Sequence, residues 1–252
     1  MVIFSSSIRD LCQAQSDADW ILVLSNLLSD PPREDLLVYL AGVLEDDAST
    51  LFRVAGALEA VEGLTILDAG WRARFRLCMP KWFSRLEAAG DFPALWCGIR
   101  RYGSMVLAWE ETQCLWDLLL SKERNLTVRT CAAQTLSEIL CHPPRLPADL
   151  GYLGDPILAL VDELLALPEQ SRGAHQRVLL MESIILLAVL GDARVLERAQ
   201  TFSAQMSEHS WRVFRFFAER LLSNSKESKP LLSQVLDCGN DLQRSVSDVV
   251  NT

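Results

Sequence analysis

The residues best suited to binding chemistry gather between Asp68 and Glu87, where the chain has five cations and no acid. These cations are Arg72, Arg74, Arg76, Lys81 and Arg85, and Arg100 and Arg101 extend the series. Four aromatic residues are interleaved with them, namely Trp71, Phe75, Trp82 and Phe83. Guanidinium groups hold phosphates and aromatic rings stack on bases, so the mixture would suit a nucleic acid or a membrane surface. We favour a structural interpretation, in which the aromatics are core and the cations extend to water. A groove for a partner protein is the remaining alternative.

Side chains for catalysis are sparse along the rest of the chain. The three histidines, His142, His175 and His209, are scattered, and each is expected in a loop or at the surface. The adjacent acids at 46–47 and 110–111 point in different directions on a helix, so neither pair suits acid–base work. The sequence has no glycine-rich phosphate loop. We therefore expect no catalytic residues, no cofactor and no metal, and we lean toward a protein that is not an enzyme.

The composition indicates a folded chain with reduced cysteines. Half of the 252 residues are hydrophobic, which excludes a disordered chain. The 33 acids exceed the 24 bases, and a net charge of −9 argues against broad affinity for nucleic acid or anionic membranes. Seven cysteines, an odd number without a C-x-x-C pair, fit a reducing compartment. The N-terminal residues lack a signal-peptide pattern, and the longest apolar run, 184–190, is too short to span a bilayer. We expect a cytoplasmic protein without a membrane span.

The spacing of apolar residues predicts an all-α protein. In 125–140 they recur at three- and four-residue steps and so line one helix face. Asn125 or Thr127 can cap the start of this helix, and prolines follow its end. The stretch 68–89 is expected as one helix kinked at Pro80, or alternatively as two helices, with Gly90 as the C-cap. The other expected helices are 5–15, 17–29 (capped by Asp17), 33–44, 51–61, 92–102, 104–121, 156–167, 175–190, 193–206, 211–223, 231–236 and 241–250.

One motif in 125–140 recurs in part elsewhere. Its order, Asn125-x-x-Val128-Arg129-x-x-Ala132, resembles the second helix of a HEAT repeat. Partial copies begin at Phe52-Arg53, Trp71-Arg72 and Phe214-Arg215, and the last includes Ala218. In the turn at 190–196, Gly191 would end one helix and Asp192 would cap the next, which resembles repeats of the phycobilisome-lyase type. The resemblance implies an irregular HEAT-like helical-repeat array, or α-solenoid, that covers 125–223 more fully than 33–89. Arg53, Arg72, Arg129 and Arg215 would then pair with acids of neighbouring repeats.

The same resemblance suggests two enzyme families. Deoxyhypusine hydroxylase is similar in architecture but needs paired His-Glu dipeptides for a di-iron site, and no histidine here precedes a glutamate. HEAT-like alkylpurine DNA glycosylases use a basic concave face with aromatic residues, for which the 71–101 segment is the nearest counterpart. Five of the seven tryptophans fall between 71 and 116. Tryptophan is enriched in binding hot spots, but core packing is the interpretation that we favour.

These observations predict four parts and two main functions. The parts are an N-terminal helical half (1–141), a Pro-rich loop or hinge (142–156), C-terminal HEAT-like helix pairs (157–223), and a polar linker with weak capping helices (224–252). The leading hypothesis is a non-enzymatic scaffold that binds another protein along a concave helical face. The alternative is a nucleic-acid-binding or DNA-repair protein that uses the 71–101 segment. A lyase or chaperone subunit for a bound chromophore, suggested by the Gly191-Asp192 turn alone, is a third hypothesis.

Overall fold

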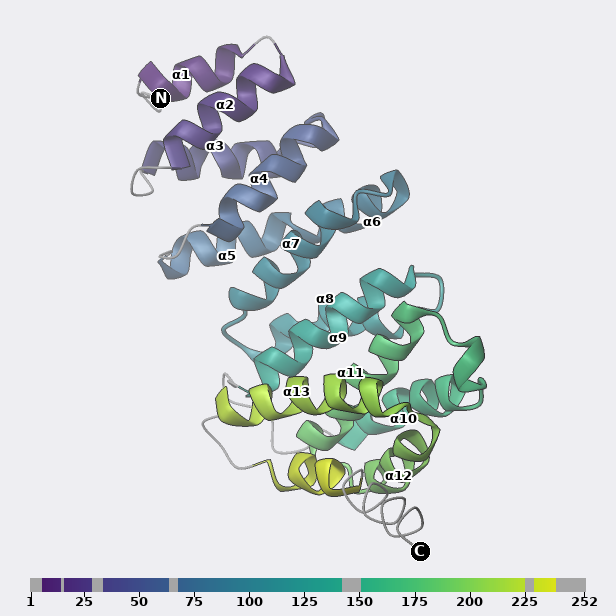
Figure 1. Ribbon diagram of the computed structural model, residues 1–252. Helices are drawn as coiled ribbons and strands as arrows, with labels where there is room; N and C mark the ends of the chain where they lie inside the picture. The colour runs from purple at the N-terminus through teal and green to yellow at the C-terminus, as the bar shows by residue number, and fades with distance from the viewer. Residues whose placement is uncertain are drawn as a thin grey trace, which may run out of the picture. The chain divides into compact units, whose positions relative to one another are not determined.

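The structure is a computed structural model that describes residues 6–14, 16–28, 34–63, 68–141, 151–224 and 229–238. All regular structure in these ranges is helical, and no strand occurs in them (Figure 1). The prediction of an all-α protein is therefore confirmed. The chain divides into two compact units, Met1–Val106 and Leu107–Thr252. No helix in the described ranges is long and apolar enough to cross a bilayer.

The first unit is built around α4 and α7. Its helices are α1 (Ser6–Gln13), α2 (Asp17–Leu28), α3 (Glu34–Glu45), α4 (Leu51–Gly63), α5 (Ala69–Cys78), α6 (Pro80–Ala89) and α7 (Phe92–Ser104). Helix α4 packs on α7, α3 and α2. Two of its neighbours come close because glycines lie at the contacts. A Cβ on Gly56 would stand 2.6 Å from the ring of Trp20, and one on Gly98 would stand 3.1 Å from Leu58. Trp20 is fully buried, so the α2–α4 contact depends on the missing side chain at Gly56.

The second unit surrounds α11. It contains η1 (Trp109–Thr112), α8 (Gln113–Leu120), α9 (Leu126–Cys141), α10 (Gly151–Leu165), η2 (Glu169–Ser171), α11 (Ala174–Leu190), α12 (Val195–Gln205) and α13 (Glu208–Asn224). Residues 230–238 are also helical. Helix α11 packs on α9, α10 and α12, and every residue of 179–189 is buried. A helix that is apolar all round is a central helix, and α11 is the core of this unit.

Glycines and a proline end several helices where the sequence predicts. Gly90 and Gly191 have left-handed backbones, with φ of 73° and 83°, and their N–H groups bond the last carbonyls of α6 and α11. Pro80 begins α6, directly after Met79, whose backbone is still right-handed α. A proline ring removes a helical hydrogen bond. The expected helix at 68–89 is thus the two helices α5 and α6.

Three other expectations about helix ends are wrong. The helix expected at 104–121 is interrupted, because α7 continues to Ser104 and η1 begins only at Trp109. Glu111 explains the break, since its carboxylate accepts hydrogen bonds from the N–H groups of Leu107 and Ala108 at 2.7 and 3.1 Å. It thereby satisfies orphan donors at a new helix start.

The caps expected from Asp17 and Asp192 also differ. Ser16, rather than Asp17, caps α2, because its Oγ accepts from the N–H of Asp19 at 3.1 Å. The Asp192 carboxylate accepts from the N–H of Arg194 at 3.0 Å, before α12 begins at Val195. Asp192 therefore forms the turn that leads into α12 rather than capping its first turn.

The expected hinge at 142–156 and the last expected helix, 241–250, fall mainly or wholly outside the described residues. Helices α9 and α10, on either side of the expected hinge, belong to the same compact unit. The boundary between the two compact units lies between Val106 and Leu107. The four-part organisation stays a prediction.

Candidate functional site

Three of the cations singled out from the sequence bind acidic residues or carbonyls at the end of α3. The Nε and Nη2 groups of Arg74 donate to the two carboxylate oxygens of Glu45, at 2.6 and 2.9 Å. Lys81 binds Asp47 and the carbonyl oxygen of Glu45, each at 2.6 Å, and Arg85 binds the carbonyl oxygen of Asp47 at 3.1 Å. The hydrogen bond from Arg74 lowers the pKa of Glu45, and that from Lys81 lowers the pKa of Asp47. The charges of Arg74 and Lys81 are therefore balanced by carboxylates within the first unit.

The aromatic residues between them are mostly core. Phe75, Trp82 and Phe83 are buried, and the indole N–H of Trp82 donates to the carbonyl oxygen of Leu44 at 2.7 Å. The guanidinium of Arg85 lies 4.3 Å from the centre of the Trp82 ring, a cation–π contact. This is the geometry of the structural interpretation, with apolar rings inside and charged ends at the surface.

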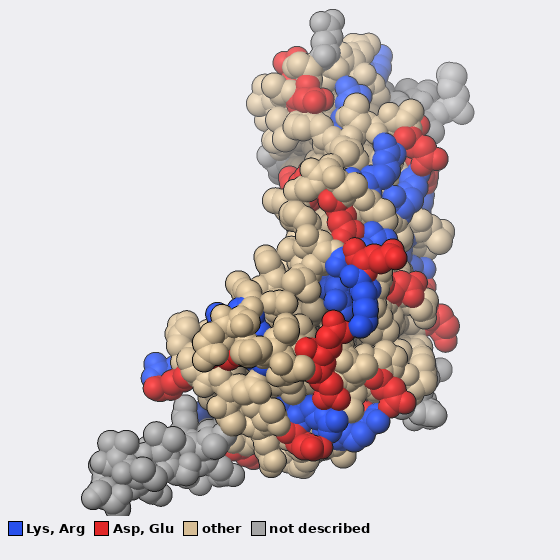
Figure 2. Space-filling model, turned by 90° about the vertical axis from the view of Figure 1, so that its right-hand side faces the viewer, with Lys and Arg blue, Asp and Glu red and all other residues tan. Residues whose placement is uncertain are grey.

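The remaining cations of the set have different surroundings. Arg76 donates to the carbonyl oxygen of Met105 at 3.4 Å, and Arg101 donates to the hydroxyl of Ser104 at 3.4 Å. Arg100 is exposed and Arg72 is half-buried. Figure 2 shows that on the face it presents, acidic and basic side chains are interspersed rather than separated by sign. A ligand for this set of cations stays a prediction.

The tryptophans are largely structural as well. Five of the seven are buried, namely Trp20, Trp82, Trp109, Trp116 and Trp211, while Trp71 and Trp96 are half-buried. The indole of Trp116 donates to the hydroxyl of Thr112 at 3.1 Å, and that of Trp109 to the hydroxyl of Tyr152 at 3.3 Å. Buried indoles with hydrogen-bond partners are typical of core packing.

The arginines of the repeated motif bind carbonyl oxygens at helix ends. Arg129 is buried, and its Nε–H donates at 2.8 Å to the carbonyl oxygen of Leu119, in the last turn of α8. Arg53 donates at 3.4 Å to the carbonyl oxygen of Ala14, just after α1. Arg215 instead pairs with Glu219 on its own helix. The hydrogen-bond partners of Arg53 and Arg129 are thus carbonyl oxygens rather than acids, and the pairing expected for Arg72 stays a prediction.

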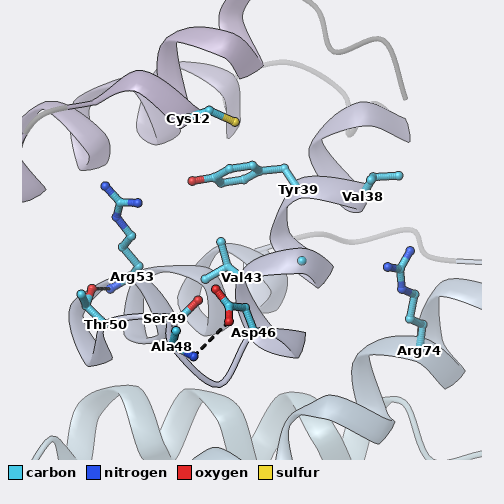
Figure 3. A pocket seen from close by; sticks show the side chains of 11 residues that line it. Cys12, Val38, Tyr39, Val43, Asp46, Ala48, Ser49, Thr50, Arg53 and Arg74 are labelled. Carbon is cyan, nitrogen blue, oxygen red and sulfur yellow. Dashed lines mark hydrogen bonds between the residues drawn. The ribbon is translucent and has the colours of Figure 1, made fainter. Parts of the chain in front are cut away.

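A cavity of about 550 Å³ lies in the first unit, where residues of α1, α3, the α3–α4 loop, α4 and α5 come together (Figure 3). Its lining residues are Cys12, Val38, Tyr39, Gly42, Val43, Asp46, Ala48, Ser49, Thr50, Arg53 and Arg74. Sequence reasoning did not find this site. The sequence signal for it was Arg53, three residues after Thr50. The hydroxyl of Thr50 caps the start of α4 and accepts a hydrogen bond from the backbone N–H of Arg53 at 3.4 Å.

Two polar groups of this cavity, Tyr39 and Cys12, are hydrogen-bond donors near neutral pH. The indole N–H of Trp20 donates to the hydroxyl oxygen of Tyr39 at 2.8 Å, so the hydroxyl hydrogen of Tyr39 remains to be donated elsewhere. Burial raises the pKa of Cys12 and of Tyr39, and the charge of Arg53 opposes both shifts. Both groups therefore stay protonated near neutral pH, and a protonated thiol is a weak nucleophile. The hydroxyl of Tyr39 and the thiol of Cys12 can therefore donate hydrogen bonds.

Metal-binding residues do not cluster in the described ranges, where no group of three or more His, Cys, Asp or Glu side chains comes together. His175 and His209 are exposed, and His142 lies outside the described residues. The cysteines that the structure describes are free thiols.

Comparison of the chain with models of protein families, with curated proteins and with solved structures finds no match.

Proposed function

We propose that this chain is a non-enzymatic, HEAT-like helical scaffold that binds another protein. The observation that carries the proposal is how the helices are oriented within each unit. The small residues of the repeated motif face inward: Ala132 and Ala218 are fully buried, and Gly56 lies against Trp20. In α4 and α13 the opposite side is left to solvent, whereas α9 is buried on nearly all sides. Helical-repeat proteins use such rows of helix faces as binding surfaces.

Exposed apolar side chains on the helices could contact a partner protein. Leu77 on α5 is 80% exposed, Leu22 on α2 is 63% exposed and Phe216 on α13 is 62% exposed. Single apolar residues at a surface are common, so they locate contacts to be tested rather than an interface. The cavity at Tyr39 and Arg53 adds hydrogen-bond donors to the surface of the first unit.

Binding of nucleic acid through the 71–101 segment receives less support. Arg74 and Lys81 are paired with carboxylates, so fewer cations remain to neutralise phosphates. The salt dependence of DNA binding scales with the number of phosphates neutralised. Salt-sensitive DNA binding that Arg72→Glu with Arg76→Glu abolishes would restore this alternative.

Photocrosslinking tests the scaffold proposal directly. A photoreactive amino acid is placed at Leu22, Leu77 or Phe216, and the chain is irradiated in its native cells. We expect at least one position to crosslink to the same protein repeatedly, and excess unmodified chain to suppress the crosslink. The purified partner should then bind the purified chain with a fixed stoichiometry in calorimetry. Turnover of a defined substrate by residues of this chain, or crosslinks that excess chain does not suppress, would refute the proposal.

A further inference from the structure

The cavity in the first unit contains one arginine, Arg53, that forms no ion pair among the described residues, although Asp46 lines the same cavity. A guanidinium has five N–H donors, yet the side chain of Arg53 makes only the 3.4 Å hydrogen bond to Ala14 among the described residues. Arg74, the other arginine at the cavity, is different, because Glu45 occupies its fork. A free guanidinium fork fits a ligand group with two coplanar oxygens.

A second donor faces the same space. Figure 3 shows the hydroxyl of Tyr39 directed toward the side of the cavity where the Arg53 side chain extends upward, below Cys12. Their proximity also appears in the influence of the Arg53 charge on the ionisation of Tyr39 and Cys12. The indole of Trp20 already fills an acceptor position on the Tyr39 oxygen. The phenolic O–H of Tyr39 is therefore directed away from Trp20 and available to an acceptor in the cavity.

Asp46 limits the charge of the ligand. It lines the same cavity, and one of its carboxylate oxygens accepts from the N–H of Ala48 at 3.0 Å. A phosphate monoester, with a charge near −2 at neutral pH, would meet one unbalanced cation and one carboxylate. A ligand group with a single negative charge is matched by Arg53 alone. Asp46 can then accept hydrogen bonds from N–H donors that lie next to that group on the ligand. A carboxylate on a peptide chain combines these two features.

We propose that this cavity binds a carboxylate side chain of an acidic peptide segment in the partner protein, held between the guanidinium of Arg53 and the hydroxyl of Tyr39. The inference rests on the proposed function and specifies the chemistry of one of its contacts. The partner segment would carry Glu or Asp at this point, with backbone N–H groups directed at Asp46.

Nuclear magnetic resonance of the full chain tests this with three probes. The carboxylate probe is glutamate blocked as the N-acetyl N-methylamide, its neutral match is the same derivative of glutamine, and inorganic phosphate is the second anion. The signals followed are the Nε–H of Arg53 and the indole N–H of Trp20. We expect the glutamate probe alone to shift both signals saturably, with a dissociation constant on the order of 1 mM, as suits a single charged contact. It should also slow alkylation of Cys12, measured by peptide mass spectrometry.

Variants separate the carboxylate site from general charge effects. Arg53→Gln should weaken the glutamate probe at least about tenfold, and Arg53→Lys, which keeps the charge but not the fork, should weaken it less. Arg212→Gln removes an exposed arginine of the second unit and should leave binding unchanged. Circular dichroism confirms that each variant is folded.

Three results would overturn the inference: no saturable shift with glutamate, an equal shift of the Trp20 indole signal in the Arg53→Gln protein, or shifts with phosphate alone. Each of them leaves the scaffold proposal standing, because that is tested by crosslinks from exposed positions outside the cavity. Conversely, saturable glutamate binding without any crosslinked protein would preserve the site and refute the scaffold.

Discussion

Glu182 offers the sharpest test of the packing in the second unit. It lies in the middle of α11, is only 4% exposed, and accepts a hydrogen bond from the amide of Gln134 on α9 at 3.1 Å. Burial raises its pKa from an ordinary 4.5 to about 7, the Gln134 hydrogen bond opposes the rise, and the charge of Glu138 adds to it. Each pKa unit corresponds to about 1.4 kcal/mol. Ionising this side chain in the folded protein thus costs about 3 kcal/mol more than in the unfolded chain.

The sign of the pH dependence follows from the protons bound. Between pH 4.5 and about 7 the folded state holds a proton on Glu182 that the unfolded state has lost. The free energy of unfolding therefore falls as pH rises through this window and is constant, for this group, above it. Glu182→Gln keeps the shape, and its amide oxygen can still accept from Gln134. The variant should match the wild-type stability near pH 4.5 and exceed it by up to about 3 kcal/mol near pH 8.

Hydrogen exchange of the α11 amides, followed from pH 5 to pH 8, measures this difference within the second unit. Glu163→Gln is the matched control, because Glu163 is half-exposed and paired with Lys122 at 2.7 Å. Lys122 lowers the pKa of Glu163, so the contribution of Glu163 to the free energy of unfolding is lost only in acid. The stability difference between the control and wild type should therefore not change with pH over the tested range. A stability difference between Glu182→Gln and wild type that does not change with pH would refute the reasoning.

The other predictions concern packing and helix ends. Gly56→Ala should destabilise the first unit by about 1–3 kcal/mol, because the added methyl meets the ring of Trp20 at 2.6 Å. Gly42→Ala should instead stabilise the unit by up to about 1 kcal/mol, because nothing lies within 4 Å of the new Cβ. Thermal unfolding of both variants checks this pair, and a loss of stability in both would contradict it. Arg129→Leu should cost about 1–3 kcal/mol, since the carbonyl of Leu119 loses its donor, whereas Arg215→Leu removes an exposed i,i+4 pair and should cost about 0.5 kcal/mol or less. Urea unfolding compares these two, and equal losses would show that the buried hydrogen bond is not the cause.

Local chemistry explains which parts of the fold were predictable. The periodicity of apolar residues identifies most of the helices, because a helix must bury one face wherever it lies. Gly90 and Gly191 were predicted as C-caps because a left-handed residue at a helix end favours glycine in any fold. The interruption at 105–108 was missed, since the carboxylate of Glu111 that caps the new helix start lies within an uninterrupted apolar pattern.

At the candidate site, the sequence predicts the cations but not the carboxylates that pair with them. The sequence places Arg74 and Lys81 in a cluster of cations without acids, and sequence distance alone leaves their charge unbalanced. Folding brings Glu45 and Asp47 to them from about 30 residues away, because α3 packs against α5. The absence of acids among the sequence neighbours therefore did not predict the charge of this surface, where Glu45 and Asp47 pair with these cations.

The sequence by itself determined that this protein is helical, where many of its helices end, and that most aromatic residues between 71 and 116 are core, because the periodicity of a helix depends on neighbours within one or two turns. Only the tertiary structure decided which charges are balanced and where a cavity opens. Arg53 and Arg74 lie 21 positions apart and look alike in the sequence, yet one has a carboxylate in its fork and the other faces open space. Coulombic and hydrogen-bonding partners act over a few ångströms of space, and the folding of distant segments decides what stands within that distance.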